Sequence, residues 1–167
     1  MNKFITMKRI NFIALTIASF AFFASLLAQF GFDKQPCKLC LISRALYALI
    51  AISAGVVLKI NRSAWRKVLI GIIAASVGFS FYHLGVENHW WAAPKGCSYE
   101  IPNLDEIKDI KKQFSKKQAV RCDQVNWEIF GVSSTLWNFG IMAGLFWLTS
   151  LGYAVISSRD KAEDENS

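Results

Sequence analysis

Long apolar stretches dominate the hydrophobic pattern of this chain and predict helices that cross a membrane. Four stretches cover residues 10–28, 41–58, 68–84 and 136–156, and each contains 17 to 21 residues. A helix needs about 20 apolar residues to span the hydrocarbon core of a bilayer. Because lipid offers no hydrogen-bond partners, such a segment satisfies its own backbone by forming a helix. We therefore expect an all-α membrane protein, a bundle of four transmembrane helices in which residues 1–167 form one domain.

Basic residues beside these stretches predict the orientation of the chain. They gather in the N-terminal tail (Lys3, Lys8, Arg9) and in the short connection between the second and third stretches (Arg62, Arg66, Lys67). Lysine and arginine concentrate in short cytoplasmic loops. Both segments, and with them both termini, are therefore expected in the cytoplasm. The loops at residues 29–40 and 85–135 then lie outside it.

The long loop and the C-terminal tail differ from the spans in composition. In residues 85–135 basic side chains are balanced by acidic ones, so this loop does not decide the orientation. Residues 103–118 predict a short amphipathic helix, which Asn103 can cap with Glu106 as reciprocal partner. We expect this helix on the membrane surface, with packing against the protein as the alternative. The acidic tail, residues 158–167, is expected to be disordered and cytoplasmic.

Composition and charge agree with a membrane protein and argue against nucleic-acid binding. Hydrophobic residues make up 53% of the chain and charged residues 19%. The formal net charge is +7, but the basic residues flank apolar stretches and form no basic-aromatic motif. Cations beside membrane spans explain that placement better than a phosphate-binding face does. We expect the lipid bilayer, and no nucleic acid, as a partner.

All four cysteines lie in the two loops that are predicted on the same side of the membrane. Cys37 and Cys40 belong to the first loop, and Cys97 and Cys122 belong to the third. Disulfides persist outside the cytoplasm, so the cysteines could form either passive structural bonds or a disulfide relay. The spacing leaves three pairings open.

The surroundings of the first pair favour redox chemistry. A Cys-x-x-Cys pair is a recurring redox unit because the second thiol resolves mixed disulfides quickly. Pro36 is well placed to open a helix there, and the positive end of that helix would favour thiolate. Arg44 follows Cys40 by four positions, so both share one helix face at the start of a span. Charge in such a position is costly and usually functional, although an arginine that reaches to the headgroups is the alternative.

A metal site is a weaker interpretation of the same residues. Four cysteines could form a four-thiolate zinc site. However, the long interval between Cys97 and Cys122 lacks the paired spacing of most such sites. His83 and His89 are interpreted as interfacial polar groups rather than ligands. We therefore expect no bound metal.

Several motifs together resemble the bacterial disulfide bond formation protein B (DsbB) family. The first is Pro36-Cys37-x-x-Cys40-x-x-x-Arg44 after the first span, with Cys97 and Cys122 in the long loop before the last. Further matching stretches run from Tyr82-His83-Leu84-Gly85-Val86-Glu87 to Trp90-Trp91, and from Cys122-Asp123 through Trp127, Gly131 and Ser133 to Trp137-Asn138. The resemblance omits only the N-terminal tail and the acidic tail. The combination is specific, whereas a lone Cys-x-x-Cys is not.

The resemblance implies a membrane enzyme, a protein-dithiol:quinone oxidoreductase of the bacterial inner membrane with its cysteine loops in the periplasm. It would re-oxidise a periplasmic thioredoxin-fold dithiol oxidase (DsbA-like) and reduce ubiquinone or menaquinone. Cys97 and Cys122 would form the loop disulfide, with Cys97 taking the mixed disulfide. Cys122 would then attack Cys37 and release Cys40, the donor to the quinone.

The quinone site and the rival functions complete these expectations. By the resemblance, Arg44 would hold and polarise the quinone, and the polar residue of the third span that approaches it is His83, Glu87 or Asn88. No dinucleotide, flavin or phosphate-binding motif appears in the sequence, which favours a quinone as the electron acceptor. A specialised paralogue serving one dedicated substrate and a tetraspan scaffold with structural disulfides stay open. A quinone reductase of the vitamin K epoxide reductase type would place its Cys-x-x-Cys in the final span.

Overall fold

The computed structural model describes the chain except for residues 1, 61, 95–96, 98–120, 126 and 166–167. Its long helices are α1 (Asn2–Gly31), α2 (Lys38–Ile60), α3 (Ser63–Glu87) and α5 (Ser134–Glu165). A hairpin of two short strands, β1 (Glu128–Ile129) and β2 (Val132–Ser133), precedes α5. All four helices are long and apolar enough to cross a membrane. The predicted all-α bundle of four membrane helices is confirmed, while the surface helix expected at residues 103–118 lies outside the described residues.

Each helix contains one of the predicted apolar stretches and continues beyond it. The largest difference is at the C-terminus, where α5 extends to Glu165 through residues that we expected to be disordered from 158 onward. Once a long helix is nucleated, each added residue gains a hydrogen bond at little further cost. Alanine, lysine, arginine and glutamate in that segment are also good helix formers. Acidic composition alone was therefore a poor guide to where this helix ends.

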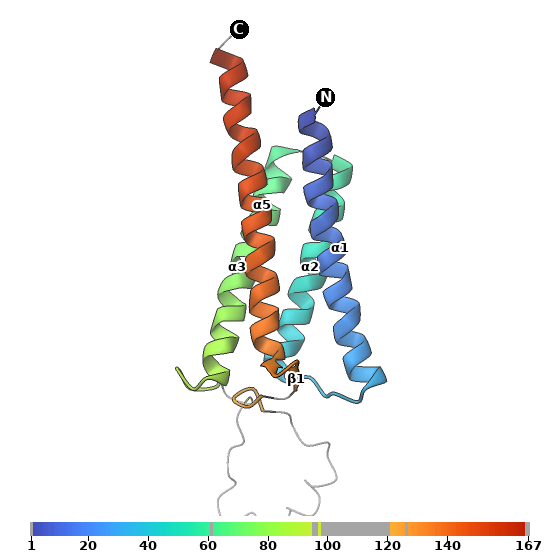
Figure 1. The fold of residues 1–167 in the computed structure, drawn as a ribbon, viewed down its shortest axis with the longest axis vertical. Coiled ribbons are helices and arrows are strands. Elements are labelled where there is room, and N and C mark those ends of the chain that lie inside the picture. The colour runs from blue at the N-terminus through green and yellow to red at the C-terminus, as the bar shows by residue number, and fades with distance from the viewer. Residues whose placement is uncertain (1, 61, 95–96, 98–120, 126, 166–167) are drawn as a thin grey trace, which may run out of the picture.

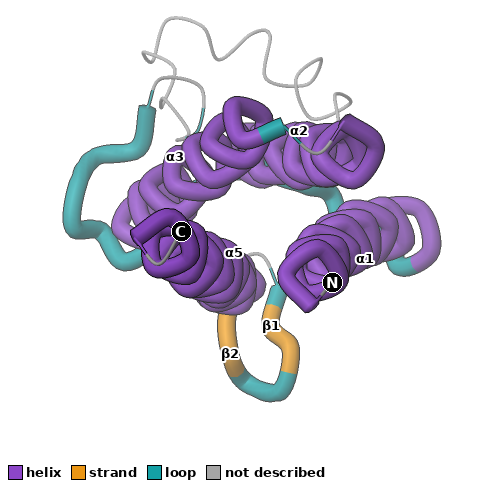
Figure 2. Tube along the Cα trace, turned by 90° about the horizontal axis from the view of Figure 1, so that it is seen from above, coloured by secondary structure: helices purple, strands orange, loops and turns teal. Residues whose placement is uncertain are grey.

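The helices form a ring in which α1 packs on α2 and α5, and α3 packs on α2 and α5 (Figure 2). The N-terminal end of α1 and the C-terminal end of α5 lie at one end of the bundle (Figure 1). The connection from α1 to α2, the end of α3 and the hairpin lie at the other end. Both segments that carry cysteines therefore meet at this second end.

The centre of the bundle is an apolar cluster, which we call the mid-bundle cluster. It consists of Ala14, Ala18, Tyr47, Ile50, Ala54, Val57, Leu69, Ile73, Met142 and Leu145. The alanines let α1 and α2 approach closely, as small residues do between membrane helices. Large apolar side chains instead face outward, with Phe20 at 75% and Phe30 at 79% exposure. A long helix with phenylalanines on its outer face needs a lipid environment, which agrees with a multi-pass membrane protein.

The hairpin before α5 fixes where that helix begins. Phe130 and Gly131 form the two-residue turn, and both have positive φ angles (54° and 74°), as such hairpin turns require. Ser133 then caps α5, because its Oγ accepts the amide of Leu136 at 3.1 Å. The tight turn and the cap start α5 beside the residues that the next subsection describes.

Candidate active site

Cys37 forms the N-cap of α2. Its carbonyl accepts the first helical hydrogen bond, from the Leu41 amide at 3.1 Å, and its Sγ accepts the Cys40 amide at 3.2 Å. From the sequence we expected Pro36 to open the helix that precedes the second span. In the structure α2 begins at Lys38, so Pro36 lies just outside it. The Cys37 side chain caps the helix, which directs its sulfur toward the positive helix end.

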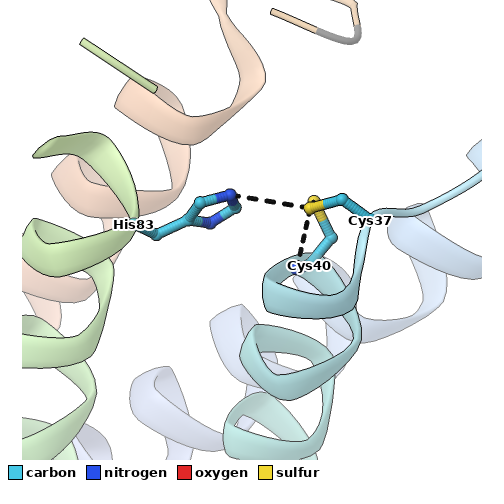
Figure 3. Close-up of side chains that lie close together, drawn as sticks. All are labelled: Cys37, Cys40 and His83. Carbon is cyan, nitrogen blue, oxygen red and sulfur yellow. Dashed lines mark hydrogen bonds between the residues drawn. The ribbon is translucent and has the colours of Figure 1, made fainter. Parts of the chain in front are cut away.

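The two thiols of the Cys-x-x-Cys pair lie against a histidine from another helix. The sulfurs of Cys37 and Cys40 are 2.7 Å apart, and His83 Nε2 on α3 lies 3.6 Å from Cys37 Sγ (Figure 3). A hydrogen bond from the Cys40 thiol lowers the pKa of Cys37 from 9.0 to about 5; burial opposes this shift, and the contact with His83 adds to it. The arrangement therefore favours a Cys37 thiolate that shares a proton with Cys40.

Cys97 and Cys122 form a disulfide, with their Cα atoms 5.1 Å apart. The Cys122 amide also donates to the Cys97 carbonyl at 2.9 Å, which ties the two segments together. The bond is buried in what we call the cysteine cluster, formed by Cys37, Leu39, Val86, Cys97 and Cys122. The loop disulfide therefore packs in one apolar cluster with Cys37. Sequence spacing alone did not determine this juxtaposition.

The end of α3 turns the chain back toward this cluster. The amides of His89 and Trp90 donate to the carbonyls of Val86 and Gly85, and His89 adopts a positive φ of 58°. These two bonds and the left-handed residue form a Schellman motif, a common C-terminal cap.

Trp91 then folds back onto α3. Its ring stacks on Tyr82 and its Nε1 donates to the Tyr82 carbonyl at 2.9 Å. A Cβ atom at Gly85 would overlap the Trp91 ring. Because Gly85 has no side chain, Trp91 can pack against α3 at the start of the segment that leads to Cys97.

Arg44 joins α2 to α1 inside the bundle. Its guanidinium donates to Gln29 Oε1 at 2.6 Å and to the Ser25 carbonyl at 2.9 Å. Its Nε is buried and has no hydrogen-bond partner among the described residues. The alternative that Arg44 reaches outward to headgroups does not agree with these contacts. A partly buried cation with one buried, unpaired donor among the described residues is suited to bind an oxygen of a ligand.

A cavity of about 130 Å³ lies beside Arg44 at the cysteine end of the bundle. It is lined by residues of α1, α2, α3 and α5 and of the segments between the helices, and these include Cys40, Arg44, Tyr47, His83, Trp127 and Asn138. Cys40 lines the cavity, whereas Cys37 does not. Glu87 is the last residue of α3 and is not among the lining residues either. Of the polar candidates on the third span, the structure therefore brings His83 to the cavity and leaves Glu87 outside.

Among the residues considered in the sequence analysis, His83 has the environment that differs most from the expected one. We interpreted it as an interfacial polar group, but its side chain is 3% exposed and its Nδ1 has no partner among the described residues. Ligand atoms of Cys37, Cys40 and His83 all lie within 4.8 Å of one another. Cys97 and Cys122 cannot supply thiolates while they are bonded to each other, so the four-thiolate zinc site is absent from this disulfide-bonded form. His89 is exposed, as an interfacial residue would be.

Sequence reasoning missed the polar residues that support the cavity. Asn138 donates to Ser80 Oγ at 2.9 Å and lies 3.5 Å from Ser43 Oγ, which links α5 to α3 and α2. Gln29 holds Arg44. The available signal was a polar amide within an apolar helix, which is uncommon unless it has a partner. Partners on other helices could not be identified from sequence.

Comparisons with known proteins agree with the family that the sequence motifs resemble. A family model described as "Disulfide bond formation protein DsbB" matches residues 7–152. An uncharacterized protein of Rickettsia prowazekii is 28% identical over 136 residues, 78% of each chain. Disulfide bond formation protein B of Dechloromonas aromatica is 27% identical over 127 residues, covering 72% of this chain and 73% of that protein. The protein of the same name from Xanthomonas axonopodis pv. citri is 27% identical over 173 residues, covering 93% and 96%.

Proposed function

The chain belongs to the DsbB family of disulfide bond formation proteins, and on this premise we propose that it passes electrons from a periplasmic dithiol protein to a membrane quinone. Family membership and the four apolar helices make it a multi-pass membrane oxidoreductase that forms disulfide bonds. The proposed electron donor is a thioredoxin-fold dithiol oxidase (DsbA-like). The proposed acceptor is ubiquinone or menaquinone.

One observation carries this proposal, namely that the two thiols of the Cys-x-x-Cys pair have different surroundings. Cys37 is 1% exposed and belongs to the same cluster as the Cys97–Cys122 disulfide. Cys40 is only partly buried against that cluster, and it alone of the two cysteines lines the cavity that also holds the Arg44 guanidinium. One sulfur is thus placed for exchange with the loop disulfide and the other for contact with a bound acceptor. A passive structural disulfide would not need its two sulfurs to have different surroundings.

The proposed relay begins at the loop disulfide. A thiolate of the soluble partner attacks Cys97 and forms a mixed disulfide, and Cys122 leaves as a thiolate. Cys122 then attacks Cys37 of an oxidised Cys37–Cys40 pair, and Cys40 leaves. Each step exchanges one disulfide for another, so no electrons are lost.

The relay ends with a reduced Cys-x-x-Cys pair. The partner's second thiolate displaces Cys97, and the partner departs with its own disulfide. Cys97 then attacks Cys122, restores the loop disulfide and frees Cys37. The two electrons of the partner's dithiol now reside on Cys37 and Cys40.

The cavity is close in size to one that holds a single aromatic ring. An apolar cavity of roughly 150 Å³ holds a benzene molecule, and this one has about 130 Å³. When bound, a quinone accepts two electrons and two protons and so regenerates the Cys37–Cys40 disulfide. Arg44 would hold a quinone oxygen through its free Nε, because the Gln29 and Ser25 contacts already fix the rest of the guanidinium. His83 would border the ring from α3.

The energetics require an acceptor of this kind. A strongly oxidising soluble partner has a potential near about −120 mV, so the acceptor must be more oxidising still. For a two-electron couple, each 30 mV corresponds to about 1.4 kcal/mol. A quinone dissolved in the membrane meets this need only if a thiol lies at the edge of the bilayer. Cys40, in the first turn of α2, occupies that position.

The proposed orientation places the cysteine end in the periplasm of a bacterial inner membrane. It is supported by Arg62, Arg66 and Lys67, which lie at the opposite end of the bundle, between α2 and α3 or in the first turns of α3. Short basic segments of this kind stay in the cytoplasm.

Quinone reduction by the detergent-purified protein tests the proposal. The protein is supplied with a reduced thioredoxin-fold dithiol, and ubiquinone and menaquinone are tried separately. We expect steady turnover by the wild type and none above background for Cys40→Ser. Lys38→Gln, an exposed neighbour inside the same motif, is the matched control and should retain turnover. Folded wild type that reduces neither quinone with several dithiol partners would favour the structural-disulfide alternative.

A further inference from the structure

The reduced Cys-x-x-Cys pair and His83 form a set of metal ligands that the proposed electron relay does not use as such. Two sulfurs and one imidazole nitrogen lie within 4.8 Å of one another. They come from two helices that are distant in sequence, α2 and α3. Soft thiolates together with imidazole are the donor set that zinc prefers. We propose that Cys37, Cys40 and His83 bind one Zn²⁺ ion when the pair is reduced, and that this ion blocks the enzyme until it is removed.

The distance between Cys37 and His83 matches that of two ligands in a zinc site, whereas the two sulfurs would have to move apart. Zinc binds sulfur at about 2.3 Å and nitrogen at about 2.0 Å, so tetrahedral sulfur and nitrogen ligands lie roughly 3.6 Å apart. His83 Nε2 lies 3.6 Å from Cys37 Sγ. Two sulfur ligands lie roughly 3.8 Å apart, and the two thiols here are 2.7 Å apart. Rotation of the Cys40 side chain would bring the third ligand into place.

The surroundings of the three side chains also suit a bound ion. Cys37 and His83 are buried, and Cys40 faces the cavity. Three protein ligands leave a fourth position open, as in other zinc sites with two cysteines and one histidine. The cavity can supply a water molecule for that position. His83 Nδ1 is buried without a partner among the described residues, and its proton would be available to a water or a ligand group in the cavity.

The chemistry makes zinc binding and disulfide formation mutually exclusive. Binding displaces the thiol proton of the Cys37–Cys40 pair and forms two zinc–sulfur bonds, and no atom changes oxidation state. Once Cys37 and Cys40 are joined as a disulfide, neither sulfur is a thiolate and the set is lost. Zinc would therefore bind the reduced enzyme, occupy the sulfur that faces the acceptor cavity and hold the relay at this stage. This regulatory part rests on the proposed function, whereas the binding site does not.

Metal binding is measured directly on the full-length chain carrying Cys97→Ser and Cys122→Ser, so that only two thiols remain. The protein is reduced, freed of reductant and titrated with Co²⁺, whose sulfur charge-transfer absorption reports thiolate ligands. Zn²⁺ then displaces the cobalt. We expect one ion per chain, and no binding after the Cys37–Cys40 disulfide is formed.

Histidine variants in the same background show whether His83 is a zinc ligand or whether the two thiols alone bind the ion. His83→Gln should weaken Zn²⁺ binding at least about tenfold, since loss of even an outer partner of a metal ligand costs 10–100-fold. His89→Gln, at an exposed histidine nearby, should leave binding unchanged. Thermal unfolding in detergent checks that both variants are folded. Equal binding by the two histidine variants, or binding by the oxidised chain, would overturn the inference.

Turnover measurements keep this inference distinct from the proposed function. For the wild-type enzyme we expect Zn²⁺ to stop quinone reduction and a chelator to restore it. Stoichiometric Zn²⁺ binding by a chain that never reduces quinone would contradict only the proposed function. Turnover that is insensitive to Zn²⁺, in a chain that binds no metal, would contradict only the zinc site.

Discussion

The mid-bundle cluster and the cysteine cluster are both buried, but they satisfy their polar groups differently. Near the mid-bundle cluster, polar side chains bond within their own helix: Ser76 donates to the Ile72 carbonyl and Thr149 to the Leu145 carbonyl, each at 2.8 Å. At the cysteine end, Asn138 and Arg44 bond across helices, and among the described residues His83 Nδ1 and Arg44 Nε have no partner. The first arrangement adds stability, and the second leaves donors for a ligand.

The residues of the mid-bundle cluster and those of the candidate site therefore lie at different positions along the bundle axis. Large apolar side chains from α2, α3 and α5 interlock in the mid-bundle cluster. The cysteine cluster contains the loop disulfide and a thiol, which exchange partners in the proposed relay. Variants of the two clusters should accordingly affect different measurements.

The largest effect on stability is expected for Ile50→Ala. Ile50 is fully buried in the mid-bundle cluster, and removing such a side chain leaves a cavity that costs about 2–5 kcal/mol. Unfolding in detergent, followed by helix content, should show this loss. Quinone reduction per folded molecule should stay near the wild-type value. An equal loss of specific activity would contradict the separation of the two clusters.

A smaller loss, about 1–3 kcal/mol, is expected for Gly85→Ala, because the added Cβ would overlap the Trp91 ring. Displacement of Trp91 should also slow exchange between the loop disulfide and Cys37, which is followed by trapping mixed disulfides with a quench of acid. Gly78→Ala in the same helix is the matched control, since a Cβ there meets nothing within 4 Å. It should be neutral or slightly stabilising. Similar behaviour of the two variants would rule out the proposed role of Gly85.

Arg44→Lys should raise the KM for quinone roughly tenfold, which is about 1.4 kcal/mol of binding free energy. Lysine keeps the charge but cannot bond Gln29 and the Ser25 carbonyl while also presenting a fixed donor to the cavity. Gln29→Leu, which removes one of these contacts, should raise the KM less. Exchange between the cysteine pairs should stay unchanged in both, as single-turnover oxidation of the dithiol partner would show. A KM that stays at the wild-type value in Arg44→Lys would exclude Arg44 from the quinone site.

The smallest expected change in stability concerns the residue that caps α2. Both Cys37→Ser and Cys37→Ala should abolish turnover, because the relay loses its acceptor sulfur. Serine can still accept the Cys40 amide, whereas alanine cannot, so Cys37→Ser should be more stable by about 1 kcal/mol. The two unfolding curves provide the comparison. Coincident curves would mean that the sulfur contact contributes nothing to the helix.

The sequence was a good guide wherever the information is local. Apolar length predicted four membrane helices, since a helix must satisfy its backbone within its own segment. The four-residue spacing placed Arg44 one turn after Cys40, and the family motifs pointed to a disulfide relay. Local rules were less exact at helix ends. They placed Pro36 inside the start of α2, where Cys37 instead forms the cap, and predicted a disordered tail where α5 continues.

By itself, then, the sequence determined the four spans, the presence of a redox-type cysteine pair and the family of the protein. Only the tertiary structure decided that His83 lies against Cys37, that Gln29 and Ser25 hold Arg44, and that Cys40 lines the cavity while Cys37 meets the loop disulfide. The physical reason is the environment. In water an amphipathic pattern shows which face of a helix is buried, but in lipid the inner and outer faces are both apolar. The rotation of each membrane helix is then set by packing and by hydrogen bonds between helices.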